Sequence, residues 1–264
     1  MDVGIKYIVT FDELCRFQSQ LLLENRKKKQ VAIYSCVVGG YDEIQDPISI
    51  SDECDYYMIT DEKKHSENVY TYIDINDVIP KTINDNTRKN RYCKINAHHI
   101  FPEYRFSIYF DGCARLKADI AREVNDLPVT RIKTLSKTDS SVYSLIYKNL
   151  IHGRDKSEIL IEQGRKYLNS GFPETYVVFH PGVMVREHNN PICVKIMDSW
   201  WNEITEFSCR DMISFPYALW SNGFYESDVS TLISTTEVWN DNWGEWSSRH
   251  KKNRKMKICE LPSI

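Results

Sequence analysis

The sequence lacks any long apolar run. No stretch among its 264 residues approaches the ~20 consecutive apolar residues that a membrane-spanning helix needs. The first residues, Met1 to Gly4, also lack a basic segment followed by an apolar one. We therefore expect neither a transmembrane segment nor a secretory signal peptide.

The sequence has no excess of basic residues either. Lys and Arg number 34 against 37 Asp and Glu, which gives a net charge of −3. Nucleic-acid-binding proteins usually carry a basic face, so this balance predicts no nucleic-acid partner. Basic clusters at residues 26–29 and 249–257 are interpreted as solvated ends of the fold. The alternative is a peripheral contact with an anionic membrane surface or a lipid-linked molecule.

The eight cysteines lack the spacing of a metal or redox motif. None of them form a C-x-x-C pair, which argues against the usual zinc and thioredoxin-type motifs. Several lie inside apolar runs, where cysteine behaves as a small buried hydrophobe. This usage is typical of a reducing compartment, so we expect a cytoplasmic protein.

Common catalytic signatures are also absent. The sequence contains no G-x-S-x-G, H-E-x-x-H, G-x-x-x-x-G-K or G-x-G-x-x-G. These absences remove support from serine hydrolases, zinc proteases, P-loop enzymes and dinucleotide-binding Rossmann enzymes.

The chain does have the composition of a globular protein, with 42% hydrophobic and 27% charged residues. A continuous apolar run at residues 31–38 predicts a strand buried on both faces, as in a parallel sheet. Further strands are predicted at 56–60, 69–73, 105–110, 129–134, 176–179 and 182–186, and helices at 11–26, 86–100, 140–150, 156–169, 191–205 and 210–220. The pattern predicts a single α/β domain with a mixed sheet flanked by helices. We divide the chain into an N-terminal helix and lead-in (1–30), the domain itself (31–222) and a Trp-rich tail (223–264) that packs on or over the site.

In open α/β sheets, ligands bind where the strands end at their carboxyl edge. The first strand ends at Gly39-Gly40-Tyr41-Asp42, where glycines allow a close backbone approach and Tyr41 can stack on a base. Asp61 follows the second strand and can accept a hydrogen bond from a ribose or a base. The alternatives are a tight turn at the glycines and a turn or helix cap at Asp61.

Three cations lie at helical spacing in the next segment. Arg88, Arg91 and Lys94 share one face of the predicted helix. Cations directed into a cleft suit a pyrophosphate, which Arg can bind with two parallel hydrogen bonds. The alternative, which these residues alone favour, is a solvated helix face.

An acid follows the apolar strand at 105–110. Asp111, in the run Asp111-Gly112-Cys113, presents a carboxylate at the ligand edge of the sheet. Divalent cations that bridge diphosphates take oxygen ligands and often only one or two carboxylates, which fits Asp111. The alternative is an ordinary Asp-Gly turn. The alternating residues 114–119 also leave a hairpin open.

The segment His152-Gly153-Arg154-Asp155 is predicted to open a helix. A histidine, an arginine and a helix N-terminus together favour an anion. The alternative is simple N-capping of the helix by Asp155.

A dense cluster follows in the last third of the chain. Asp211 is predicted at a helix start, where its charge favours the helix dipole, and it can also act as a general base. Trp200 and Trp201 can pack on the apolar face of a sugar or, alternatively, in the core.

Taken in order, six segments carry a family resemblance. They are Gly39-Gly40-Tyr41-Asp42; residues 88–94 with His98 and Phe101-Pro102; residues 107–109 with Asp111-Gly112; His152 with Arg154; residues 182–188; and residues 200–204 with Ser208, Arg210-Asp211 and residues 213–215. Together they resemble the glycosyltransferase-like domain family of plant mucilage-related and turgor-regulation proteins, which has bacterial members in polysaccharide gene clusters.

The resemblance implies a GT-A-like (Rossmann-like) fold and transfer of a sugar from a nucleotide-sugar donor, with a UDP-sugar favoured, to a glycan or glycolipid acceptor. It also implies Mn²⁺ or Mg²⁺ bound by Asp111. The Asp-x-Asp of many such enzymes maps onto Asp111-Gly112-Cys113, where Cys113 replaces the second acid. Cys113, through its backbone or side chain, and a later histidine, His188 or His250, are further candidate metal ligands.

On this hypothesis Asp211 is the catalytic residue. It accepts the acceptor's proton if the enzyme inverts configuration, and it steadies the positively charged sugar if the enzyme retains configuration. The donor is bound by Gly39, Gly40, Tyr41, Asp42, Asp61, Arg88, Arg91, Lys94, Asp111 and Gly112, and the acceptor or sugar by His152, Arg154, Arg186, Trp201 and Arg210.

Two other functions stay open. A lipid or glycan hydrolase would need an activated nucleophile or a paired-carboxylate motif, and neither appears. A non-catalytic sugar- or nucleotide-binding module is supported by Cys113 in place of an acid.

Overall fold

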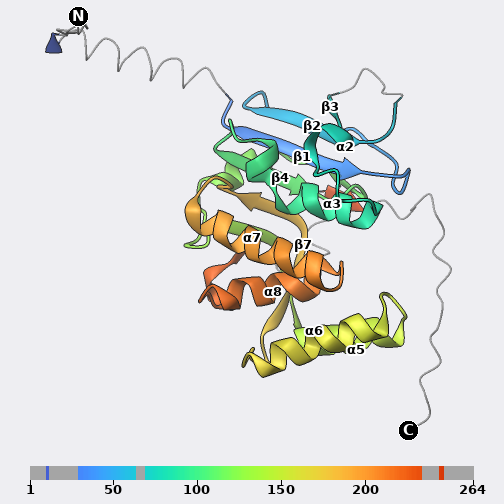
Figure 1. The fold of residues 1–264 in the computed structure, drawn as a ribbon. Coiled ribbons are helices and arrows are strands. Elements are labelled where there is room, and N and C mark those ends of the chain that lie inside the picture. The colour runs from blue at the N-terminus through green and yellow to red at the C-terminus, as the bar shows by residue number, and fades with distance from the viewer. Residues whose placement is uncertain (1–9, 12–28, 64–68, 234–243, 247–264) are drawn as a thin grey trace, which may run out of the picture.

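A mixed seven-stranded sheet forms the centre of the molecule (Figure 1). The computed structural model describes residues 10–11, 29–63, 69–233 and 244–246. The strand order is β3-β2-β1-β4-β7-β6-β8; β1 to β4 run parallel, and β7 runs antiparallel to β4 and β6. The strands are β1 (Val31–Val37), β2 (Cys54–Thr60), β3 (Thr71–Asp74), β4 (Phe106–Phe110), β6 (Ile132–Ser141), β7 (Val177–Arg186) and β8 (Ser230–Thr231).

Helices flank this sheet, which confirms the predicted α/β class. In Figure 1, α3, α7 and α8 lie against one face, and α5 and α6 pair beyond α8. A separate antiparallel ribbon joins β5 (Ala114–Leu116) to β9 (Gly244–Trp246). The helices are α2 (Ile75–Val78), α3 (Asn86–Ile95), α4 (Ala97–Ile100), α5 (Val142–Ile151), α6 (Ser157–Asn169), α7 (Pro191–Glu206) and α8 (Asp211–Ser221), with 3-10 turns η1 (Ala121–Val124) and η2 (Glu226–Asp228).

Hydrophobic cores lie on both faces of the sheet, because successive side chains of a strand point to opposite faces. In β1, Tyr34 and Cys36 join the core under α3, α7 and α8, whereas Ile33 and Val37 join the core on the other face. All residues of β1 are buried. This two-sided burial is what the continuous apolar run predicts for a central parallel strand.

Some elements differ from the sequence predictions. The helix predicted at 86–100 is divided at Asn96, whose backbone N–H and side-chain amide both donate to the carbonyl of Tyr92. The strands predicted at 176–179 and 182–186 form one strand, β7, which passes through Pro181. The pairing of β7 with β6 shifts register around Pro181, between the paired residues Met184 and His180. Proline has no backbone N–H, and at this irregular position no regular hydrogen bond between the two strands is lost.

The hairpin that the Asp-Gly pair left open does not form. Residues 114–116 are a strand, β5, but it pairs with β9 and not with β4. The predicted helix at 11–26 lies outside the described residues except for Phe11. His250 and the basic clusters other than Lys29 also lie outside them. Of the Trp-rich tail, the structure describes residues 223–233 and 244–246. In the part of the chain that is described, no helix combines the length and apolar character needed to cross a membrane.

Candidate functional site

The turn after β1 is tied to the end of β2. Gly39 and Gly40 have φ angles of 66° and 58°, a conformation that favours glycine. The N–H of Gly39 donates to both carboxylate oxygens of Asp61, at 2.9 and 3.1 Å. These residues lie at the predicted edge of the sheet, and they shape the turn without lining the cavity described below.

Gly39→Ala is expected to lower the free energy of unfolding by more than the ~1–2 kcal/mol that a left-handed backbone costs a residue with a Cβ. The added Cβ would also collide with the side chain of Asn86. Gly40→Ala is the matched control, because a Cβ there meets nothing within 4 Å. Urea unfolding of both variants measures the difference. An equal loss of unfolding free energy in Gly39→Ala and Gly40→Ala would contradict the close approach of Asn86 to Gly39.

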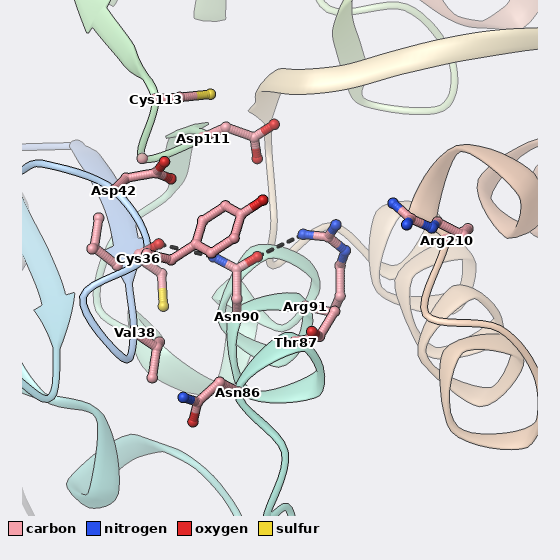
Figure 2. A pocket seen from close by; sticks show the side chains of 13 residues that line it. Cys36, Val38, Asp42, Asn86, Thr87, Asn90, Arg91, Asp111, Cys113 and Arg210 are labelled. Carbon is pink, nitrogen blue, oxygen red and sulfur yellow. Dashed lines mark hydrogen bonds between the residues drawn. The ribbon is translucent and has the colours of Figure 1, made fainter. Parts of the chain in front are cut away.

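A cavity of about 250 Å³ lies at the carboxyl ends of β1 and β4, beside α3 (Figure 2). In Figure 2, Asp42 and Asp111 lie on the side of β1 and β4, and the guanidinium groups of Arg91 and Arg210 lie across from them. The cavity is lined by Cys36, Val37, Val38, Tyr41, Asp42, Asn86, Thr87, Asn90, Arg91, Asp111, Gly112, Cys113 and Arg210. Of the predicted site residues, it brings together Tyr41, Asp42, Arg91, Asp111, Gly112, Cys113 and Arg210.

Gly112 allows the two carboxylates to share this cavity. A Cβ on Gly112 would stand 2.9 Å from Oδ2 of Asp42 and 2.6 Å from a methyl group of Val37. The segment is also a tight turn, since the N–H of Ala114 donates to the carbonyl of Asp111 at 2.8 Å. The glycine therefore serves both the turn and the close packing of Asp42 beside Asp111.

Lys94 is buried between two carboxylates. Its side chain is 1% exposed, and its Nζ lies 2.6 Å from Oδ2 of Asp211 and 3.2 Å from Oδ1 of Asp111. The hydroxyl of Tyr109 donates to the same oxygen of Asp111 at 3.0 Å. The sequence predicted that Lys94 faces a diphosphate, but its amine is directed to these two acids instead. Lys94 thus fixes Asp111 and Asp211 relative to each other.

Asp211 begins α8, as predicted. Burial alone would raise the pKa of its carboxyl, but the nearby charges of Arg91 and Lys94 hold that pKa well below its ordinary value. Arg91 Nε lies 3.5 Å from Oδ2 of Asp211. The carboxylate is therefore charged at neutral pH and is a weak proton acceptor.

A second cavity of about 160 Å³ shares two arginines with the first. It is lined by Asp85, Thr87, Arg91, Arg154, Asp155, Cys209 and Arg210. Arg210 donates to the carbonyl of Arg154 at 2.7 Å, and the hydroxyl of Ser208 donates to Asp155 at 2.6 Å. His152 lines neither cavity and ends α5 as its C-cap, whereas the sequence predicted that it opens a helix.

Arg186 has a structural role in the core, not a place in a sugar pocket. It is completely buried. Its guanidinium donates to the carbonyl oxygens of Lys94 and Ile95 and to the hydroxyl of Tyr34. A buried charge needs such partners, and these join β7 to the end of α3.

Other predicted residues also lie outside the lining of both cavities. Arg88 donates to backbone carbonyls at the end of α7. Trp201 packs edge to face on Tyr92, with ring centres 5.2 Å apart. His188, a candidate metal ligand, is fully buried with Nε2 2.9 Å from the carbonyl oxygen of Phe101. For Trp201 the contact with Tyr92 agrees with the alternative of core packing. For Arg88 the alternative was a solvated helix face, whereas its guanidinium binds the backbone at the end of α7.

Asn90 and His180 are among the residues at or near the site that were not predicted from the sequence. Asn90 donates to the carbonyl of Cys36 at 2.8 Å and accepts from Arg91, so it joins α3 to the end of β1. Its signal was readable, since the polar residues 86, 87, 90 and 91 share one helix face. His180 lies on β7 near the Lys94 network, which acts on its pKa. A histidine between two predicted strands offered no comparable signal.

The residues of the first cavity fit a divalent cation bound together with a diphosphate. Asp42 and Asp111 both line it. The hydrogen bonds to Asp111 from Lys94 and Tyr109 both go to Oδ1. Its Oδ2 therefore has no such bond within the described residues, and hard cations that bridge phosphates often use only one or two carboxylates.

The other predicted ligands fit less well. Burial, and then Asp111 and Asp42, raise the pKa of the Cys113 thiol to about 12, so it stays protonated, whereas the thiolate is the form that binds metals. His250 lies outside the described residues. Across the described ranges, no three His, Cys, Asp or Glu side chains gather as a metal site.

Part of this chain is similar in sequence to a known protein. The Probable hexosyltransferase MUCI70 of Arabidopsis thaliana is 23% identical in a match of 223 residues, which covers 74% of this chain and 38% of that protein. The chain thus spans well under half the length of this relative.

Two solved structures are weakly similar in fold. The apo WbbM bifunctional glycosyltransferase has a TM-score of 0.46 at 14% identity, over 78% of this chain and 39% of that one. Apo mouse xyloside xylosyltransferase 1 has a TM-score of 0.43 at 10% identity, over 80% and 89% of the two chains. Both TM-scores lie below 0.5, so neither likeness carries an argument about the site.

The family match is broader. The TOD1/MUCI70 glycosyltransferase-like domain matches residues 17–229, which include the lining of both cavities. This range also contains the six segments on which the resemblance was predicted. The chain belongs to the TOD1/MUCI70 glycosyltransferase-like domain family.

Proposed function

We propose that this chain is a glycosyltransferase that moves a hexose from a nucleotide-sugar donor, with a UDP-hexose favoured, to a glycan or glycolipid acceptor in polysaccharide biosynthesis. The observation that carries the proposal is the first cavity, where Asp42 and Asp111 lie across from Arg91 and Arg210 (Figure 2). Carboxylates for a divalent cation and arginines for phosphates are the groups that a metal-bound nucleoside diphosphate needs. Membership of a glycosyltransferase-like family supports the class of reaction.

The donor occupies the first cavity in this proposal. Tyr41 lies beside the base, and Arg91 and Arg210 bind the diphosphate. The N-terminal turn of α3 also lines the cavity, where the helix dipole favours an anion. When bound, Mn²⁺ or Mg²⁺ would be held by Asp111 and Asp42 and would neutralise charge on the leaving diphosphate.

Asp211 acts in this proposal as a fixed negative charge. Lys94 and Arg91 hold its pKa below the ordinary value, so it is a poorer proton acceptor than a free carboxylate. A fixed anion stabilises positive charge that develops on the transferred sugar. This favours the second of the two roles that the sequence left open for Asp211.

We also propose a cytoplasmic location. Six cysteines of the described residues are free thiols, which suits a reducing compartment. A glycolipid acceptor would bring the enzyme into peripheral contact with a membrane surface.

Turnover tests the proposal. The purified chain is incubated with UDP-glucose, UDP-galactose and other UDP-hexoses in Mn²⁺, and UDP release is measured. The proposal predicts release from one of them well above that of the folded Asp111→Asn variant. Release equal to that of the variant for every donor would contradict it.

Arg210→Met is expected to weaken UDP binding about ten- to a hundredfold, because hydrogen bonds to a charged partner contribute about 1.5–3 kcal/mol. Arg165, exposed on α6, provides the control Arg165→Met, which should leave the affinity unchanged. Isothermal titration of UDP in Mn²⁺ measures both. If Arg210→Met binds UDP with the wild-type affinity, Arg210 is not part of the donor site.

A further inference from the structure

The first residues of strand β7 extend beyond the carboxyl end of the neighbouring strand β4. Phe110 pairs with Val183, and the N–H of Asp111 donates to the carbonyl of Gly182 at 2.8 Å. Since the two strands are antiparallel, the residues that precede Gly182 lie beyond the carboxyl end of β4. His180 is therefore placed at the ligand edge of the sheet, on the side of β4 that is away from β1 and the first cavity.

The C-terminal strand β9 returns to the same place. It pairs with β5, which begins at the end of the turn after β4, and Trp246 is opposite the first residue of β5. Glu245 forms ion pairs with Arg115 and Lys117 at 3.4 and 3.2 Å, which hold this ribbon together. The ring of Trp246 meets the ring of His180 edge to face, with centres 5.8 Å apart.

Gly182 completes this surface. A Cβ on Gly182 would stand 2.7 Å from the ring of His180 and 3.1 Å from that of Trp246. Both rings thus rest on the backbone that accepts the N–H of Asp111. We call His180, Gly182 and Trp246 the aromatic wall.

The imidazole of this wall has an unused polar atom. Nδ1 of His180 is buried and has no hydrogen-bond partner in the part of the chain that the structure describes. Burial lowers the pKa of the ring, Lys94 lowers it further, and Asp111 and Asp211 oppose them. The ring is therefore neutral at neutral pH. Leaving a buried polar atom without a partner is costly, so a bound group that supplies a hydrogen bond to it would be stabilised there.

We propose that the aromatic wall binds a sugar ring of the acceptor glycan. Trp246 packs on the apolar C–H face of the ring, and Nδ1 of His180 forms a hydrogen bond with one of its hydroxyls. The assignment to the acceptor rests on the proposed function, in which the nucleotide fills the cavity on the β1 side of Asp111. The wall lies on the opposite, β7 side, so the donor and the acceptor would meet at Asp111.

Saturation-transfer NMR with methyl β-glycosides of glucose, galactose and xylose, in the presence of UDP and Mn²⁺, tests this assignment. The wild type is expected to bind at least one glycoside. Trp246→Ala and His180→Phe should each weaken that binding about five- to tenfold. His180→Asn and Trp246→Phe should recover part of it, because they restore a polar atom or an aromatic face. Tyr147→Ala, an exposed aromatic on α5, is the control and should bind as the wild type does.

UDP affinity separates the wall from the donor site. It is expected to be unchanged in both wall variants, with folding checked by circular dichroism. Binding of no glycoside by the wild type, or wild-type binding by folded His180→Phe and Trp246→Ala, would overturn the proposal. An equal loss of UDP affinity would also overturn it, by assigning the wall to the donor. If the wild type binds a glycoside through the aromatic wall but binds no nucleotide, the proposed transferase function is wrong. The proposal that the wall is a sugar-binding site is then still supported.

Discussion

Asp111→Asn is expected to lower the rate of sugar transfer about a thousandfold, which corresponds to about 4 kcal/mol of transition-state stabilisation. The amide removes the charge that would hold a divalent cation beside the diphosphate. Its Oδ1 can still accept the hydrogen bonds of Lys94 and Tyr109, so the chain should stay folded. Initial rates of UDP release with a UDP-hexose, together with a thermal unfolding curve, measure both effects.

The control for this variant is Asp139→Asn, an exposed aspartate on β6. It removes the same charge from the chain away from the cavity and should leave the rate unchanged. Wild-type turnover in a folded Asp111→Asn variant would make Asp111 a turn residue. The metal site and the donor geometry proposed above would then be wrong.

Lys94→Met is expected to lower the free energy of unfolding by about 3–5 kcal/mol, because it removes the buried cation that contacts both Asp111 and Asp211 and leaves Arg91 as the remaining cation beside Asp211. Lys94 is 1% exposed and contacts both Asp111 and Asp211. The control is Lys29→Met, because the ion pair of Lys29 with Asp55 is exposed and such pairs contribute only about 0–1 kcal/mol. Urea unfolding at neutral pH measures both variants. A similarly small loss of unfolding free energy in both variants would contradict the conclusion that Lys94 stabilises the fold through Asp111 and Asp211.

The loss in Lys94→Met is expected to shrink as the pH falls. In the wild type, burial raises the pKa of Asp211, but the charges of Arg91 and Lys94 lower it by more, so this pKa lies below its ordinary value. The stabilisation is therefore present above the unfolded-state pKa of about 3.9 and is lost as the pH falls through the folded-state value. In Lys94→Met, Arg91 remains but the second cation that lowers the pKa of Asp211 is lost, so we expect the variant to take up a proton at a higher pH than the wild type does. A difference between the two proteins that is the same at pH 7 and at pH 3 would indicate lost packing, not lost charge.

Local signals in the sequence predicted most of the fold. The apolar run of β1 indicated a central parallel strand, because a strand covered on both faces has no polar side. The helix predicted at 191–205 is α7 (Pro191–Glu206), where Asn190 caps the first turn and a proline takes the first helical position. These are interactions between near neighbours, and the residue types alone reveal them.

Contacts between distant segments were harder to predict. The spacing of Arg91 and Lys94 placed them on one helix face, but the partner of Lys94 on α8 is 117 positions away. Which acid meets that amine depends on how α8 packs against α3. The same limit applies to His180, which lies beyond the carboxyl end of β4 only because β7 continues through Pro181 past that end.

The site therefore combines two kinds of residue. Asp42, Asp111, Arg91 and Arg210 line the cavity, and each stood out in the sequence as a charged residue at a strand end or on a helix. Arg88 and Arg186 stood out equally and support the fold instead, because charge and spacing do not show whether a side chain faces ligand or backbone. Only the partners of each side chain separate the two groups.

The most direct test of the transferase proposal is a thermal-shift panel of nucleoside diphosphates and nucleotide sugars, each with and without Mn²⁺, on the wild type and on Asp111→Asn. A ligand that binds only the native state stabilises it by about 2.7 kcal/mol at a hundred times its dissociation constant. We expect that UDP or a UDP-hexose raises the Tm, that Mn²⁺ increases the shift, and that Asp111→Asn loses the increase. A folded wild-type protein whose Tm no nucleotide changes would contradict the transferase proposal.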